Sequence, residues 1–142
     1  MEGCTVLDVG CGLVHDSELF FEYRVRRVVG IDSSARNLEL VQEYTRRKGV
    51  AGRCEFIMAD FLDHPFRETF DMVVALGVFD FVSDPVRVLK RMSDLANEKV
   101  VASFPRVSPL RAPLRKLRYA LRGCSVYFYT GAKLKQICHD AG

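Results

Sequence analysis

The chain reads Val6-Leu7-Asp8-Val9-Gly10-Cys11-Gly12 at residues 6–12, and this stretch decides its fold. The apolar residues predict a buried strand, and the Gly-x-Gly that follows predicts a tight turn leading into a helix. In open parallel sheets, ligands bind beyond the carboxyl ends of the strands, where glycines let the backbone approach a ligand closely. The stretch therefore predicts a strand and a ligand site at its end.

Short apolar runs predict five strands, and their lack of polar alternation indicates burial on both faces, as in parallel sheets covered by helices. They cover residues 4–9, 27–31, 54–58, 70–76 and 100–104. Helical spacing predicts helices beginning near residues 15, 34, 85 and 130, with caps at Asp84 and Thr130 and a stop at Gly49. Alternating strands and helices predict one α/β domain over residues 1–142, with a doubly wound, mainly parallel sheet.

Composition narrows the classes of protein that the chain can belong to. Hydrophobic residues make up 49% and charged residues 27%, which argues against disorder. No apolar stretch reaches the roughly 18 residues of a membrane span, and the first residues do not resemble a signal peptide, so we expect a cytoplasmic location. The five cysteines form no C-x-x-C pair and the three histidines lie far apart, so we expect neither a disulfide framework nor a metal site.

A carboxylate at the end of the second predicted strand suggests which ligand binds. Asp32 follows the glycines by about 20 residues, a position from which it would accept hydrogen bonds from both ribose hydroxyls. A nicotinamide dinucleotide and another adenosine-containing cofactor both suit this unit. A dinucleotide site has a third glycine where this chain has His15, and Asp8 adds negative charge, which favours a sulfonium or ammonium group over phosphate. The residues therefore favour an adenosine-containing cofactor other than a nicotinamide dinucleotide. A nicotinamide-dependent reductase stays the less favoured alternative.

Four segments in this order resemble the class I S-adenosylmethionine-dependent methyltransferases: residues 6–12, 29–32, 58–61 and 70–74. The resemblance implies a Rossmann-like core, S-adenosylmethionine as the cofactor and S-adenosylhomocysteine (SAH) as the product. It also implies the role of each site residue: Gly10 and Gly12 along the methionine portion, Asp32 at the ribose hydroxyls, Asp60 at the adenine amino group, the Phe61 backbone at the ring, and Leu76 with Gly77 as the floor. The cofactor-binding set is Asp8, Gly10, Cys11, Gly12, Asp32, Ser33, Asp60, Phe61, Leu76 and Gly77.

The chain departs from the family pattern at three places. Val14 stands where the family often has a third glycine. A helix before the first strand and the final β-hairpin are expected to be missing, which would leave strand 100–104 as an exposed edge unless another subunit or a missing segment covers it. Residues 78–81 replace a frequent aromatic or histidine pair, so no catalytic base is assigned, and Phe79 and Phe81 are expected in the core or pocket wall. These departures keep a non-catalytic methyltransferase-like binding or regulatory domain, or a fragment, as the alternative.

Residues 106–123 are expected to form a basic helical insertion. Residues 106–122 hold six basic residues and no acid, beside a stripe of leucines. This pattern fits a solvated helix, and it fits equally well a helix that contacts a membrane surface or attracts an anionic substrate. Nucleic acid is disfavoured, because basic and aromatic residues are not interleaved. The stretch 79–129 resembles the tetrapyrrole and quinone biosynthesis branches of the family, which implies a small-molecule acceptor with a carboxylate or hydroxyl on a lipophilic aromatic compound.

Overall fold

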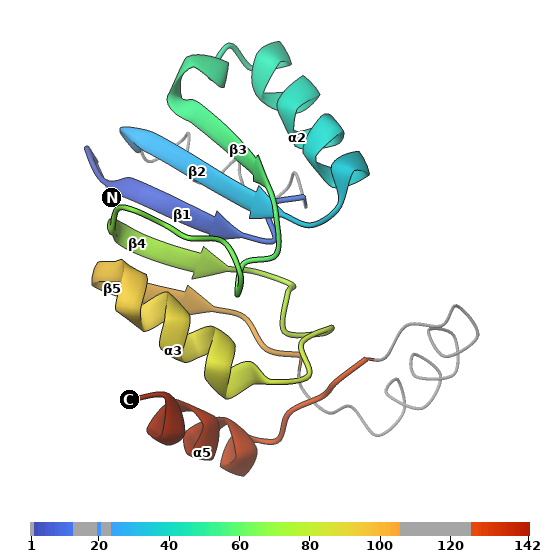
Figure 1. The fold of residues 1–142 in the computed structure, drawn as a ribbon, viewed down its shortest axis with the longest axis vertical. Helices are drawn as coiled ribbons and strands as arrows, with labels where there is room; N and C mark the ends of the chain where they lie inside the picture. Colours follow the sequence, from blue (N-terminus) through green and yellow to red (C-terminus); the bar gives the residue numbers. More distant parts are fainter. Residues whose placement is uncertain (1, 13–19, 21–23, 106–125) are drawn as a thin grey trace.

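The computed structural model describes residues 2–12, 20, 24–105 and 126–142 of the chain. These residues form parallel strands with helices packed against them (Figure 1). The strands are β1 (Thr5–Val9), β2 (Arg27–Asp32), β3 (Cys54–Met58), β4 (Phe70–Ala75) and β5 (Ala96–Ala102). The helices are α2 (Ala35–Arg47), α3 (Pro85–Leu95) and α5 (Gly131–Ala141), with a short 3-10 turn at Ala51–Arg53.

The sheet has the order β3-β2-β1-β4-β5, and every pairing in it is parallel. From β1 the chain runs outward to β2 and β3, and it then returns to place β4 on the other side of β1. This reversal of direction leaves a crevice beyond the carboxyl ends of β1 and β4, which is where open α/β sheets bind ligands. The predicted doubly wound, parallel α/β fold is confirmed.

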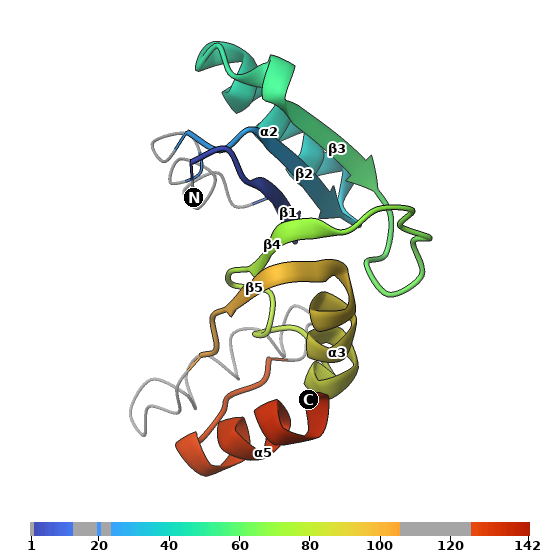
Figure 2. The same cartoon turned by 90° about the vertical axis from the view of Figure 1, so that its left-hand side faces the viewer.

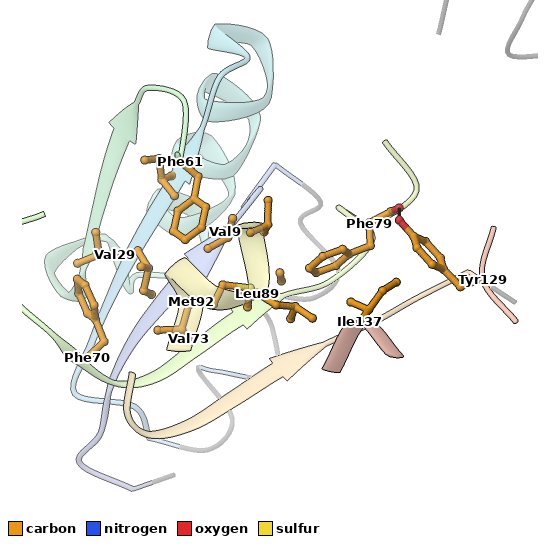
Figure 3. Close-up of a cluster of buried hydrophobic side chains, with 14 residues drawn as sticks. Val9, Val29, Phe61, Phe70, Val73, Phe79, Leu89, Met92, Tyr129 and Ile137 are labelled. Atoms are coloured by element: carbon orange, nitrogen blue, oxygen red, sulfur yellow. Dashed lines mark hydrogen bonds between the residues drawn. The ribbon is translucent and has the colours of Figure 1, made fainter. Parts of the chain in front are cut away.

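Helices cover both faces of the sheet (Figure 2). Neighbouring residues of β3 show the division, because Phe56 packs with the core under α2 and Ile57 packs with the core under α3 and α5. The larger core joins strand residues to residues of the two helices (Figure 3): Val9, Val29 and Val73 with Leu89, Met92 and Ile137. Burying a side chain of this size contributes about 1.5–3 kcal/mol, so this core carries much of the stability.

Helix ends agree with their sequence signals. Asp84 caps α3 by accepting from the Arg87 N–H at 3.1 Å, and Thr130 caps α5 by accepting from the Lys133 N–H at 3.3 Å. Gly49, with a φ of 70°, follows the end of α2. Both predicted caps and the predicted stop are confirmed.

The fifth strand differs from its prediction. It covers Ala96–Ala102 rather than 100–104, because residues 97–99 are polar and exposed at the edge of the sheet and carry no apolar signal. The expected edge position of this strand is confirmed. The helix predicted at 15–24 lies mainly, and the basic insertion at 106–123 wholly, outside the described residues. No helix in the described part of the chain is long and apolar enough to cross a membrane.

Candidate functional site

A cavity of about 560 Å³ opens at the carboxyl ends of the strands. Its walls come from the segments that follow β1 to β4 and from the first turn of α3. The volume falls in the range of roughly 300–1,000 Å³ that is usual for small-molecule sites. The residues that line it are Val9, Gly10, Ile31, Asp32, Ser33, Asn37, Ala59, Asp60, Phe61, Leu62, Leu76, Gly77, Val78, Phe81, Val82, Ser83, Asp84, Arg87 and Val88.

Asp32 is held in place at one side of the cavity. Its carboxylate accepts hydrogen bonds from the Ser34 N–H at 2.8 Å and the Gly12 N–H at 3.2 Å. The side-chain amide of Asn37 donates to both carboxylate oxygens, at 3.2 and 3.4 Å. An ionised carboxylate offers about four acceptor positions, and the four contacts from these three N–H donors engage both of its oxygens. The arrangement orients Asp32 before a ligand binds.

The glycines after β1 permit close packing within the protein. Gly10 has a φ of 73°, and a Cβ atom there would lie 2.4 Å from a methyl group of Val78. A Cβ atom on Gly12 would lie 2.3 Å from the Cβ atom of Asn37. The first glycine therefore brings the turn against the segment after β4, and the second brings it against the start of α2. The sequence pattern predicts close approach of a ligand at both glycines, and close packing against Val78 and Asn37 is a second reason for them.

Seven of the ten predicted site residues meet around the cavity: Gly10, Asp32, Ser33, Asp60, Phe61, Leu76 and Gly77. Asp8, Cys11 and Gly12 do not line it. Asp8 is buried within β1, and Cys11 packs against Leu38 and Val41 of α2. The contact of these three residues with a ligand stays a prediction.

Cys11 has the properties of a structural residue. Burial raises the pKa of its thiol well above the usual range, and the charges of Asp8 and Asp32 raise it further. The thiol lies against Gly30, where a Cβ atom would come within 2.6 Å of the sulfur. A neutral, buried thiol is a poor nucleophile, so Cys11 stabilises the turn by packing.

The loop after β3 brings an acid and an aromatic ring to the cavity. The side chain of Asp60 accepts from the Leu62 N–H at 2.7 Å, and its carbonyl accepts from the His64 N–H at 3.0 Å. The resulting tight turn leaves Asp60 exposed and Phe61 buried. Carboxylate and aromatic groups therefore lie next to each other at this end of the cavity.

The opposite wall follows β4 and is mainly apolar. Gly77 has a φ of 72° and donates its N–H to the Ser103 hydroxyl at 2.8 Å, which ties the start of this wall to the end of β5. Phe79 is fully buried, whereas Phe81 is 51% exposed and lines the cavity. The expectation that Phe79 and Phe81 belong to the core and the pocket wall is confirmed.

Sequence reasoning missed several residues of the site, among them Asn37, Val82 and Arg87. One signal was available for Asn37, which is the third residue after the cap of α2 and so lies within reach of the strand end. Val82 and Arg87 belong to no motif.

The donors and acceptors around the cavity suit a nucleoside. Asp32 and Asp60 offer acceptors for hydroxyl and amino groups, and Phe61 with Leu76 and Val78 offers an apolar surface for a planar base. Within the described ranges, no group of three or more His, Cys, Asp or Glu side chains is placed to hold a metal ion.

The chain is similar to known methyltransferases. The model of a methyltransferase domain family matches residues 1–142. Cycloartenol-C-24-methyltransferase 1 of Oryza sativa subsp. japonica is 34% identical over 91 residues, which are 63% of this chain and 26% of that protein. The ubiquinone biosynthesis O-methyltransferase of Rhodopseudomonas palustris (strain TIE-1) is 33% identical over 95 residues, which are 67% of this chain and 36% of that protein.

Solved structures share the fold. Magnesium protoporphyrin IX methyltransferase from Synechocystis PCC 6803 with bound SAH has a TM-score of 0.77 and 21% sequence identity. The match covers 99% of this chain and 64% of that one. The three proteins named here are longer than this chain, which covers 26%, 36% and 64% of their lengths.

Proposed function

The chain belongs to the class I S-adenosylmethionine-dependent methyltransferases, and from this premise we propose that it binds S-adenosylmethionine in the cavity and transfers the methyl group to a small-molecule acceptor. The observation that carries the proposal is the convergence of Asp32, Asp60 and Phe61 on one cavity. These residues come from two segments that are separate in the sequence and follow neighbouring strands. Their chemistry suits the ribose and the adenine of the cofactor.

Each residue has a defined task in this proposal. Asp32 accepts hydrogen bonds from the ribose hydroxyls, Asp60 accepts from the adenine amino group, and Phe61 packs against the ring. The cofactor supplies a methyl group activated by its attachment to a sulfonium. The protein then contributes alignment of the acceptor with that methyl group and exclusion of water.

We propose an acceptor that is lipophilic and aromatic, with a carboxylate or hydroxyl as the methylated group. Phe81 and Val82, the apolar residues of the wall after β4 that are not assigned to the base, support this choice. The relatives named above act, by their names, on cycloartenol, in ubiquinone biosynthesis and on magnesium protoporphyrin IX. A carboxylate acceptor needs no general base, whereas a hydroxyl needs a group to take its proton.

Location and assembly are part of the same proposal. The basic residues at 106–122 support a peripheral membrane contact of a cytoplasmic protein, which would bring the site close to lipophilic acceptors. This segment lies outside the described residues. The edge position of β5 supports an oligomer formed through that strand.

Calorimetric titration with SAH tests the proposal. The wild-type chain is compared with Asp32→Asn, which keeps the shape of the side chain, and with Asp94→Asn, which changes an exposed acid on α3. We expect the wild type and the control to bind alike and Asp32→Asn to bind roughly 10- to 100-fold more weakly, because it loses charge-assisted hydrogen bonds. Absence of binding by the wild type would overturn the proposal. Binding without turnover on sterol, quinone or porphyrin acceptors would instead favour a non-catalytic binding domain.

A further inference from the structure

Arg91 of α3 does not line the cavity, but it contacts the loop that carries Asp60 and Phe61. Its Nε–H donates to the carbonyl of Phe61 at 2.8 Å, and a terminal N–H donates to the carbonyl of His64. The guanidinium also lies over two aromatic rings of the loop, 5.7 Å from the centre of Phe61 and 5.9 Å from that of Phe66. One side chain therefore holds residues 61–66 through both backbone and rings.

The contacts matter because this loop contains neither helix nor strand. Residues 59–69 connect β3 to β4 across the sheet, and the described hydrogen bonds inside the loop come mainly from the turn at Asp60. Arg91 joins that turn to α3, which is anchored in the core by Leu89 and Met92. A guanidinium presents its donors in a rigid plane, so it fixes two carbonyls relative to each other in a way that an ammonium group cannot.

We propose that Arg91 is a positioning residue for adenine recognition: it fixes the turn at residues 60–64 and so sets the preference of the site for adenine over other bases. The proposal rests on the function proposed above. Asp60 is exposed, and its side chain bonds to an N–H of the same turn, so a displaced turn moves the acceptor for the adenine amino group. Phe61 is the direct partner of Arg91 and also lines the cavity, so its ring moves with the turn.

A selectivity measurement separates positioning from general support of the fold. Wild type, Arg91→Lys, Arg91→Met and the control Lys90→Met, an exposed cation on the same helix, are titrated with two ligands. One ligand is SAH, and the other is its inosine analogue, in which a carbonyl oxygen replaces the adenine amino group. We expect Arg91→Met to bind SAH roughly tenfold more weakly and to bind the analogue almost as the wild type does, so that the preference for adenine falls by about that factor. Arg91→Lys should recover only part of the preference, and Lys90→Met should keep all of it.

Hydrogen exchange of the ligand-free protein gives a readout that does not depend on cofactor binding. The amides of Leu62, Asp63 and His64 are bonded to Asp60, and we expect them to exchange faster in Arg91→Met but not in Lys90→Met. If the wild type does not bind SAH, the proposed function fails while these rates still report whether Arg91 holds the turn. An unchanged adenine preference or unchanged exchange in Arg91→Met would overturn the positioning role. Equal loss of affinity for both ligands would likewise show a merely structural role.

Discussion

Single residues after β1 explain how the Asp32 carboxylate is held in place. Gly12 lets α2 approach the turn so closely that the amide of Asn37 reaches Asp32. Gly10 has a left-handed backbone, which costs about 1–2 kcal/mol for a residue with a Cβ atom, and also faces Val78. Local backbone geometry and the orientation of a binding carboxylate are therefore linked.

Gly12→Ala should weaken cofactor binding through Asn37. The new Cβ atom would lie 2.3 Å from that of Asn37, so the amide must move away from Asp32. We expect SAH affinity to fall several-fold, measured by calorimetry beside a thermal melt. Gly52→Ala is the matched control, because a Cβ atom there meets nothing within 4 Å. Wild-type affinity in Gly12→Ala would show that Asn37 does not orient Asp32.

Cys11 should resist alkylation in the native protein. Its thiol is buried and its pKa is raised by burial and by the charges of Asp8 and Asp32, so little thiolate forms at neutral pH. We expect iodoacetamide to label the exposed Cys138 first and Cys11 only after unfolding, as followed by peptide mass spectrometry. Equal labelling rates at the two positions would mean that the turn over Cys11 opens readily.

At the scale of elements, side-chain bonds join the starts of β1 and β4. One carboxylate oxygen of Asp71 accepts from the Thr5 N–H at 2.7 Å and from the Thr5 hydroxyl at 2.9 Å. The Asp71 N–H donates back to that hydroxyl at 3.1 Å. These bonds lower the pKa of Asp71, and they set the relative position of the two strands that flank the crevice.

The lowered pKa of Asp71 predicts a pH dependence of stability. A carboxyl whose pKa is lower in the folded state stabilises the fold above its unfolded pKa of about 3.9, and this stability is lost as the pH falls through the folded value. We therefore expect Asp71→Asn to be less stable than the wild type at pH 7 and the difference to shrink below about pH 4. Urea unfolding across this pH range measures the difference, with Asp94→Asn as control. A difference that does not change with pH would contradict the prediction.

At the scale of the whole molecule, the segment before α5 is bonded to the wall of the cavity. Tyr129 is buried and donates its hydroxyl to the carbonyl of Phe79 at 3.1 Å (Figure 3). The Tyr127 N–H donates to the carbonyl of Asp80 at 2.8 Å, and the ring of Phe104 contacts those of Phe79 and Tyr129. Residues about 50 positions apart in the sequence thereby form one support for the apolar wall.

Tyr129→Phe should test this support. The variant keeps the aromatic packing and removes the hydroxyl, which leaves the Phe79 carbonyl without that donor. We expect the free energy of unfolding to fall by about 1 kcal/mol in urea denaturation. A midpoint equal to that of the wild type would show that this hydrogen bond contributes nothing to the fold.

Local sequence signals determined the central strands, the helix caps, the turn after β1 and the acid at the end of β2. Burial on both faces makes β1, β2 and β4 mainly apolar. Capping at Asp84 or Thr130 depends on groups within three residues. The signal failed at residues 97–99, because an edge strand in contact with solvent has no need of apolar residues.

Only the tertiary structure decided how the two walls of the cavity are held. Arg91 meets Phe61, and Tyr129 meets Phe79, across 30 and 50 residues of sequence. No periodicity or motif marks such partners, because both contacts form only after the sheet order places α3 and the segment before α5 beside the loops after β3 and β4. The sequence by itself therefore determined the strand ends that offer ligand groups, and the packing of distant elements determined their final positions.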